Sequence, residues 1–189
     1  MVSYMHSSEG SIKVLNSIFM RLFIAINFDN KTKQNILTVQ KRLKELGRGT
    51  FTRPDNLHLT LAFLGEVPEE RVEDLKLLMD GLEIPRLSLN FNYTGCFRSD
   101  LELWWIGIEY NAALSALQRV LIKRLKEAGF KPDDKRFKPH ITLARRMHIG
   151  HVDTKTLLPV EFKTSVNSIS LMLSHQVEGR LTYTELYHV

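Results

Sequence analysis

The chain has 189 residues, of which 43% are hydrophobic and 25% are charged, and 26 basic against 21 acidic side chains give a net charge of +5. This composition is typical of a soluble globular domain, it excludes a disordered, collagen-like or wholly coiled-coil chain, and its mild positive charge suits a polyanionic partner. The single cysteine, Cys96, excludes an internal disulfide and favours a cytoplasmic location. No apolar run approaches the ~20 residues that a membrane-spanning helix needs.

The first half of the chain alternates predicted strands and helices. Residues 1–19 are polar and rich in serine, so we predict an N-terminal extension over 1–19 and a single domain over 20–189. In chain order, we predict a strand at 20–28, a helix capped by Asp29 or Asn30 that ends near Leu46, a strand at 57–64, and a helix that Pro68 opens and that ends before Pro85.

The second half is richer in strands. We predict strands at 87–97 and 101–109 joined by a hairpin turn, a helix between the Asn111 cap and Gly129, and strands at 139–145, 166–174 and 181–188. The hairpin links are too short to connect parallel strands, so the order β-α-β-α-β-β-α-β-β-β predicts antiparallel pairing and an α+β fold.

A short sequence occurs almost unchanged in two places. The copies are His58-Leu59-Thr60-Leu61-Ala62-Phe63 and His140-Ile141-Thr142-Leu143-Ala144-Arg145, which begin 82 residues apart (58 to 140), and each opens a predicted strand. Side chains alternate between the two faces of a strand, so the histidine and threonine of each copy point to one face and the apolar residues point to the other. Each copy therefore predicts an imidazole beside a hydroxyl.

Two such pairs suggest acid–base chemistry. If an approximate two-fold axis relates the copies, both pairs face one cleft, where a neutral imidazole accepts a proton while an imidazolium donates one. A single histidine on a strand is more often a structural group than a catalyst. The repetition of the pair favours a catalytic site.

The repeat resembles the two-histidine (2H) phosphoesterase superfamily, and within it the RNA 2′,3′-cyclic phosphodiesterases, also called 2′-5′ RNA ligases. The resemblance covers about residues 20–189 and rests on several pieces: the opening 21–26, the histidine blocks 56–65 and 136–145, the hairpin segments 95–97 and 104–109, and Gly179 with Tyr183. The hairpin between Phe97 and Trp104 lacks the proline-rich turn and the arginine of the family pattern. The resemblance implies a bilobal α+β fold, in which two pseudo-symmetric antiparallel sheets with outer helices flank a central cleft.

The resemblance also implies a reaction, the metal-independent hydrolysis of RNA 2′,3′-cyclic phosphate ends to 2′-phosphates, with 2′-5′ RNA ligation as an accompanying reaction. It makes His140 the general base and His58 the general acid, two roles that remain open to exchange, and it assigns Thr60, Thr142 and Arg145 to the phosphate oxygens. The expected partners are RNA ends or nucleotide 2′,3′-cyclic phosphates, and the expected state is a monomer.

Two alternatives remain open. One is a 2H phosphodiesterase with another substrate, namely 2′-5′ oligoadenylate, ADP-ribose cyclic phosphate or an RNA 3′ tail. The other is an RNA- or nucleotide-binding module without turnover, although such a module needs no matched acid and base.

Arg145 and Phe63, at the same position of the two copies, pose a geometric problem. The fifth residue after the histidine lies on the opposite face of a regular strand, so Arg145 reaches a phosphate only if the strand ends or bulges. Arg146 is equally suitable by chemistry, and the family pattern selects Arg145. For Phe63 two interpretations stand, a core side chain or an aromatic ring that stacks on a nucleobase.

We expect no metal and no cofactor. His148, His151 and Asp153 lie close together in the sequence, but a short loop with two histidines is usually solvated. A glycine-rich phosphate-binding loop is absent from the sequence. The basic run 131–138 suits the attraction of RNA, although such runs are usually just solvated.

Overall fold

The computed structural model describes residues 18–98, 102–133, 135–150, 152, 157–158 and 160–189. In chain order its elements are β1 (Phe19–Asn27), α1 (Asn30–Leu46), β2 (Arg48–Phe51), a 3-10 turn (Pro54–Asn56), β3 (His58–Pro68), a 3-10 turn (Glu69–Arg71), α2 (Val72–Asp80), β4 (Leu87–Phe97), β5 (Leu103–Ile108), α3 (Ala112–Glu127), β6 (His140–His148), β7 (Phe162–Val166), β8 (Ser170–Val177) and β9 (Arg180–His188). Most of the predicted extension, residues 99–101 in and beside the predicted hairpin turn, His151 and Asp153 lie outside the described residues.

Every predicted helix and strand is present, with three corrections. Pro68 ends β3 instead of opening a helix, and a 3-10 turn separates it from α2. The predicted strand 166–174 spans the end of β7 and the start of β8, because the chain passes there from one sheet to the other. Strand β2 and most of β7 were not predicted, because both are short: β2 has four residues, mostly exposed, and β7 has five residues, whose partly buried positions include the polar Thr164.

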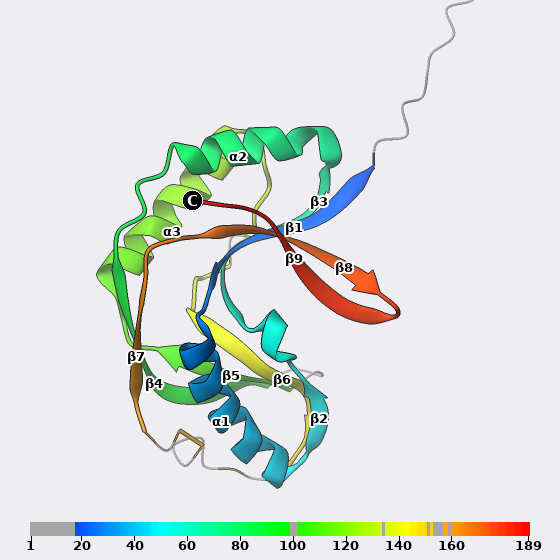
Figure 1. The fold of residues 1–189 in the computed structure, drawn as a ribbon, viewed down its shortest axis with the longest axis vertical. Coiled ribbons are helices and arrows are strands. Elements are labelled where there is room, and N and C mark those ends of the chain that lie inside the picture. Colours follow the sequence, from blue (N-terminus) through cyan, green and yellow to red (C-terminus); the bar gives the residue numbers. More distant parts are fainter. Residues whose placement is uncertain (1–17, 99–101, 134, 151, 153–156, 159) are drawn as a thin grey trace, which may run out of the picture.

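Two antiparallel sheets form the two lobes, so the predicted bilobal α+β fold is confirmed. The first sheet has the order β3-β1-β8-β9 and the second has the order β2-β6-β5-β4-β7. The four strands β3, β1, β8 and β9 of the first sheet occupy the same positions as β6, β5, β4 and β7 of the second. The second sheet has one additional strand, β2, beside β6. Figure 1 shows the first sheet with α2 and α3 in the upper half of the molecule, and the second sheet with α1 in the lower half.

The lobes do not coincide with the two halves of the sequence. In the unit β1-α1-β3 both strands lie in the first sheet, but α1 packs against β2, β6 and β7 of the second. In the matching unit β5-α3-β6 both strands lie in the second sheet, but α3 packs against β3 of the first. Each unit thus gives its helix to the other lobe, and the chain crosses between the lobes several times (Figure 1).

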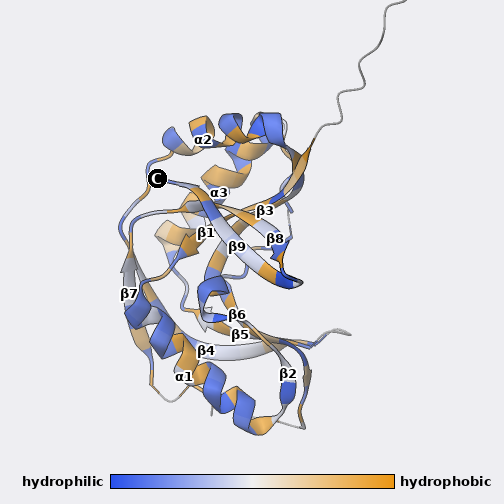
Figure 2. Cartoon of the chain, turned by 45° about the vertical axis from the view of Figure 1, so that its right-hand side comes forward, coloured by the Kyte–Doolittle hydropathy of each residue, from blue (hydrophilic) through white to orange (hydrophobic). Residues whose placement is uncertain are grey.

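The helices are amphipathic and cover the outer faces of the sheets. Ile36, Val39 and Leu43 of α1 are buried, as are Leu114, Leu117, Leu121 and Leu125 of α3, and Figure 2 shows the alternation of apolar and polar residues along α1. The Asp29 and Asn111 side chains accept hydrogen bonds from the first turns of α1 and α3, as predicted for helix caps. Within the described part of the chain, no helix has the length and apolar character to span a membrane.

Strand β1 is central in the first sheet and is buried on both faces. Leu22, Ile24 and Ile26 belong to the main core, whereas Phe23 and Ala25 pack with Met172 on the opposite face. Burial on both faces explains why this strand is almost continuously apolar.

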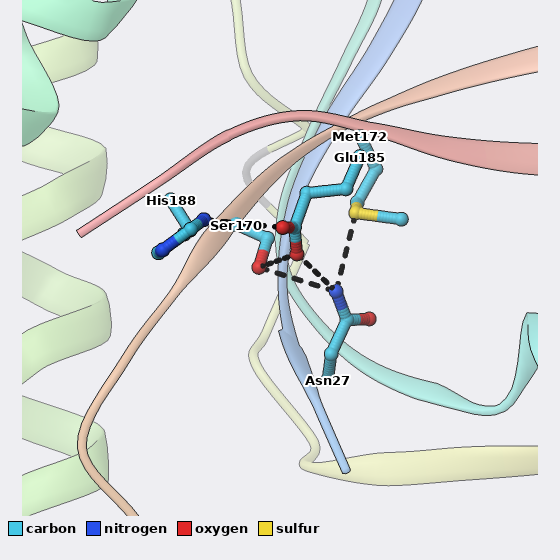
Figure 3. A network of polar contacts seen from close by, with 5 residues as sticks. All are labelled: Asn27, Ser170, Met172, Glu185 and His188. Atoms are coloured by element: carbon cyan, nitrogen blue, oxygen red, sulfur yellow. Dashed lines mark hydrogen bonds and ion pairs between the residues drawn. The ribbon is translucent and has the colours of Figure 1, made fainter. Parts of the chain in front are cut away.

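A polar network fixes the end of β1 (Figure 3). Asn27 donates hydrogen bonds from its amide nitrogen to the Ser170 hydroxyl (3.1 Å) and the Glu185 carboxylate (2.9 Å), and Ser170 donates to the same carboxylate (2.7 Å). Partial burial raises the pKa of Glu185, but the hydrogen bonds from Ser170 and Asn27 and the nearby His188 outweigh it, so the net pKa is lowered. The charged carboxylate thus ties β1, β8 and β9 together where the chain leaves the first sheet. Asn27 is also the cross-strand neighbour of His58.

Candidate active site

The two repeats lie on β3 and β6 and place their polar residues around one cleft. In both strands the histidine and threonine are partly exposed and the residues between and after them are buried, as alternation requires. The cleft has a volume of about 290 Å³. Its walls include the residues predicted for the site, namely His58, Thr60, His140, Thr142 and Arg145.

A bulge in each strand solves the problem posed by Arg145. In β3, Ala62 pairs with Ile24 and Thr60 with Ala25, so Leu61 is an extra residue. In β6, Ala144 pairs with Trp104 and Thr142 with Trp105, so Leu143 is the extra residue. An extra residue reverses the alternation beyond it. The fifth residue after each histidine therefore returns to the face that carries the histidine.

Arg145 and Phe63 lie on that face as a result. Arg145 lines the central cleft, whereas Arg146 has a left-handed φ of 53° and is not among the cleft residues. Phe63 lines the two side spaces that flank the cleft and packs partly against Phe23 and its neighbours. The Arg21 guanidinium lies over the Phe63 ring, 5.0 Å from its centroid.

Glutamine side chains hydrogen-bond both bulges. Gln40 of α1 is buried and donates from its amide nitrogen to the carbonyl oxygens of Leu143 (2.9 Å) and Thr52 (2.7 Å). Gln118 of α3 donates in the same way to the carbonyl oxygen of Leu61 (3.4 Å). Each bulge in a histidine strand is thus supported by the helix that belongs to the other unit of the fold.

Both histidines are held in the same tautomer. His58 Nδ1 lies 2.8 Å from the Asn56 carbonyl oxygen, and His140 Nδ1 lies 2.7 Å from that of Lys138, in each case two residues earlier. A carbonyl only accepts, so Nδ1 carries the hydrogen and Nε2 of the neutral ring is the basic nitrogen. His58 Nε2 is 3.0 Å from the Thr60 hydroxyl, which donates to it.

Aromatic rings surround both imidazoles. Phe23 and Tyr183 lie 4.8 and 5.1 Å from the His58 ring, and Phe97 and Trp105 lie 5.2 and 6.1 Å from the His140 ring, between centroids. These rings exclude water from one side of each histidine. The two halves of the site are therefore alike in their surroundings as well as in their repeat.

This environment disfavours the charged imidazoles. Burial lowers the pKa of His58 from 6.5 to about 4; the hydrogen bond to Asn56 opposes the shift, and the charges of Arg145 and His140 add to it. Burial also lowers the pKa of His140, the Lys138 carbonyl opposes this, and the charges of Lys138 and Arg145 add to it. Both rings are neutral at pH 7 in the free protein.

Asn56 is a supporting residue that the sequence analysis did not single out. Its carbonyl orients His58, while its buried side chain donates to the Leu181 carbonyl (3.0 Å) and accepts from the Tyr183 backbone N–H (3.3 Å). The amide thereby pairs with β9 as a neighbouring strand would, and holds Tyr183 against His58. Asn56 opens the histidine block 56–65, but nothing in that block predicts the role of its side chain.

Among the described residues, no group of three or more His, Cys, Asp or Glu side chains is arranged to hold a metal ion. His148 ends β6, and the other two members of the His148, His151 and Asp153 set lie outside the described residues.

Comparison with known proteins places this chain in a family. The model of the LigT-like phosphoesterases matches residues 26–103 and 106–183. The chain belongs to this family. It is a phosphoesterase with the 2H phosphoesterase fold, and the two matched segments contain one histidine repeat each.

Individual members show how far the likeness extends. The RNA 2′,3′-cyclic phosphodiesterase of Archaeoglobus fulgidus is 31% identical over 67% of this chain and 72% of its own length. The enzyme of the same name from Escherichia coli is 30% identical over 88% of this chain and 93% of its own. The crystal structure of E. coli LigT complexed with 3′-AMP superposes with a TM-score of 0.74 and 29% identity, over 90% of this chain and 96% of that one.

We predict that the histidines titrate at low pH in the free protein and at higher pH when an anion is bound. In an NMR titration of the imidazole resonances, assigned with His58→Asn and His140→Asn variants, both rings should be neutral Nδ1–H tautomers at pH 7, and His58 should protonate near pH 4. Inorganic phosphate should raise both pKa values, because an anion stabilises the imidazolium. A His58 pKa near 6.5 that phosphate leaves unchanged would contradict this description of the site.

Proposed function

We propose that the protein hydrolyses RNA 2′,3′-cyclic phosphate ends to 2′-phosphates by two-histidine acid–base catalysis that needs no metal. The observation that carries the proposal is the pair of equivalent imidazoles on one cleft, each beside a threonine, with the Arg145 cation on the same wall. The names of the relatives and the 3′-AMP complex of E. coli LigT agree with a nucleotide phosphate as the ligand.

In the proposed mechanism the two imidazoles act on opposite sides of the phosphorus. His140 Nε2 takes a proton from a water molecule as its oxygen bonds to phosphorus. The bond from phosphorus to the 3′-oxygen breaks, and the His58 imidazolium gives its Nε2 proton to that oxygen. The product keeps its phosphate on the 2′-oxygen, and exchange with solvent restores the two protonation states.

The remaining predicted residues stabilise the phosphate. Thr60 and Thr142 donate hydroxyl hydrogen bonds to its non-bridging oxygens, and Arg145 adds a charge-assisted donor as negative charge grows. The bound anion also offsets the burial that holds the pKa of His58 low, so that this histidine is protonated when the substrate is in place. An RNA 5′-hydroxyl in the position of the water would give a 2′-5′ bond, which is the ligation reaction.

We also propose a monomer, because one chain supplies both walls of the cleft. Residues 20–189 would act as a single domain behind the extension 1–19, and the lone cysteine supports a cytoplasmic location.

The test uses a short RNA that ends in a 2′,3′-cyclic phosphate, with excess EDTA present. We expect release of the 2′-phosphate, identified by chromatography against 2′- and 3′-phosphate standards, and a loss of about 100-fold or more in kcat for His58→Ala and for His140→Ala. Burial lowers both histidine pKa values, so kcat/KM should follow a bell-shaped curve that peaks below pH 6.5.

A second substrate separates the roles of the histidines. A cyclic ester with sulfur at the 3′ position has a leaving group that needs no proton, so His58→Ala should retain activity on it and His140→Ala should not. Activity retained by His140→Ala and lost by His58→Ala would instead make His140 the general acid and His58 the general base. Turnover of only 2′-5′ oligoadenylate or ADP-ribose cyclic phosphate would establish another 2H substrate, and RNA binding by folded protein without turnover of any of these esters would establish a binding module.

We propose that Phe63 stacks on a nucleobase of the substrate, since it shares the cleft face with His58 and lines both side spaces. Phe63→Ala should raise KM and reduce the preference among cyclic esters of adenosine, guanosine, cytidine and uridine, while Phe63→Tyr keeps both. Unchanged base preference in a Phe63→Ala protein with native circular dichroism would refute the stacking role.

A further inference from the structure

A groove leads away from the catalytic cleft along one side of α3. Its inner part has a volume of about 800 Å³ and opens into the cleft at Thr60 and His140, which line both. Its outer part has a volume of about 600 Å³ and continues across the exposed face of α3. The two parts share Gln118, Asp133, Lys135, Arg136 and Phe137, so they form one path.

The charge of the groove is strongly one-sided. Six basic residues line it, Arg119, Lys123, Lys126, Lys135, Arg136 and Lys138, against two acidic ones, Asp133 and Glu127. The whole chain, in contrast, has 26 basic and 21 acidic residues. The modest net charge of the protein is therefore concentrated beside the site, where it attracts a polyanion.

The inner part also offers flat apolar surfaces. Phe63, Phe97 and Phe137 are only partly buried there. Nucleobases stack on such rings in single-stranded RNA complexes, while cations at the rim contact the phosphates.

The walls of the groove are ordered by specific contacts. The Asp133 backbone N–H donates to the Phe63 carbonyl (2.9 Å), which anchors the segment before β6 to the edge of β3. The Lys138 ammonium lies 4.2 Å from the Trp105 ring centroid. On α3, Arg119, Lys123 and Lys126 are spaced by four and three residues, so they share one face of the helix, opposite the buried leucines.

We propose that this groove binds the RNA strand on the 5′ side of the cyclic phosphate, with a base in the inner part and backbone phosphates along α3. The inference rests on the proposed function, because it assumes that an RNA end occupies the cleft. It makes the protein an enzyme that prefers polynucleotide ends to cyclic mononucleotides.

The test compares two triple variants that lose the same charge. R119Q/K123Q/K126Q neutralises the α3 face of the groove, and K31Q/K41Q/K163Q neutralises three exposed lysines of α1 and β7 that line neither part of it. Each is assayed on a ladder of RNAs with 2′,3′-cyclic ends, from the mononucleotide to a hexanucleotide, at several salt concentrations.

We expect kcat/KM of the wild type to rise with RNA length and to fall with salt. The groove variant should lose about tenfold or more on the hexanucleotide, with a shallower salt dependence, and change the mononucleotide rate by less than about twofold. The control variant should follow the wild type. Equal losses of kcat/KM in both variants, or a wild-type kcat/KM that does not depend on RNA length, would refute RNA binding in the groove.

Binding of a labelled hexanucleotide, followed by fluorescence anisotropy, separates the groove from the proposed reaction. If the wild type turns over no cyclic ester, the proposed function fails. Weaker hexanucleotide binding by the groove variant alone would then still support RNA binding in the groove. Equal binding by the wild type and both variants would refute RNA binding in the groove.

Discussion

The arrangement of side chains around the cleft depends on a reciprocal pair of contacts. The helix of each β-α-β unit donates a hydrogen bond to the bulge in the histidine strand of the other unit. Gln40 on α1 donates to Leu143 in β6, and Gln118 on α3 donates to Leu61 in β3. A regular β6 would direct Arg145 into the core, where an unpaired guanidinium costs several kcal/mol. With the bulge, the buried leucine and alanine stay in the core and the arginine reaches the cleft. The helix of each β-α-β unit therefore supports the histidine strand of the other unit through a hydrogen bond.

The same strand geometry sets the chemistry of the histidines. Alternation brings each imidazole beside a threonine, and a backbone carbonyl two residues earlier fixes the tautomer. Aromatic rings from other strands of the same sheet exclude water from one side of each imidazole. The free site is consequently uncharged at its two imidazoles and cationic at Arg145, an arrangement suited to an incoming phosphate. In the proposed mechanism, the bound anion supplies the charge that lets one imidazole become protonated, so acid and base are distinguished only when substrate is present. The proposed RNA groove beside α3 would extend this attraction beyond the phosphate itself.

Much of this arrangement was predictable from the sequence because it follows from local patterns. The repeat and the period of two indicated which side chains share the cleft, and the apolar stripes with their Asp29 and Asn111 caps located the helices. Other features depend on contacts between distant segments. The bulges at Leu61 and Leu143 require the pairing register, which no single strand reveals. The exchange of α1 and α3 between lobes, the pairing of the Asn56 amide with β9, and the short strands β2 and β7 depend in the same way on residues far apart in the chain.

The most direct test of this account is a double-mutant cycle between Gln40 and Arg145, measured as kcat/KM on a cyclic-ended RNA. Gln40→Met keeps an unbranched side chain but removes the buried donors. The expected loss is about 1–3 kcal/mol, which corresponds to a decrease of about 5- to 150-fold in kcat/KM if the whole loss acts on the transition state. We predict that loss when Arg145 is present and a change of less than about twofold in the Arg145→Ala background, with all four proteins assayed well below their melting temperatures. The same factor in both backgrounds would show that Gln40 does not act through Arg145 and would contradict the account.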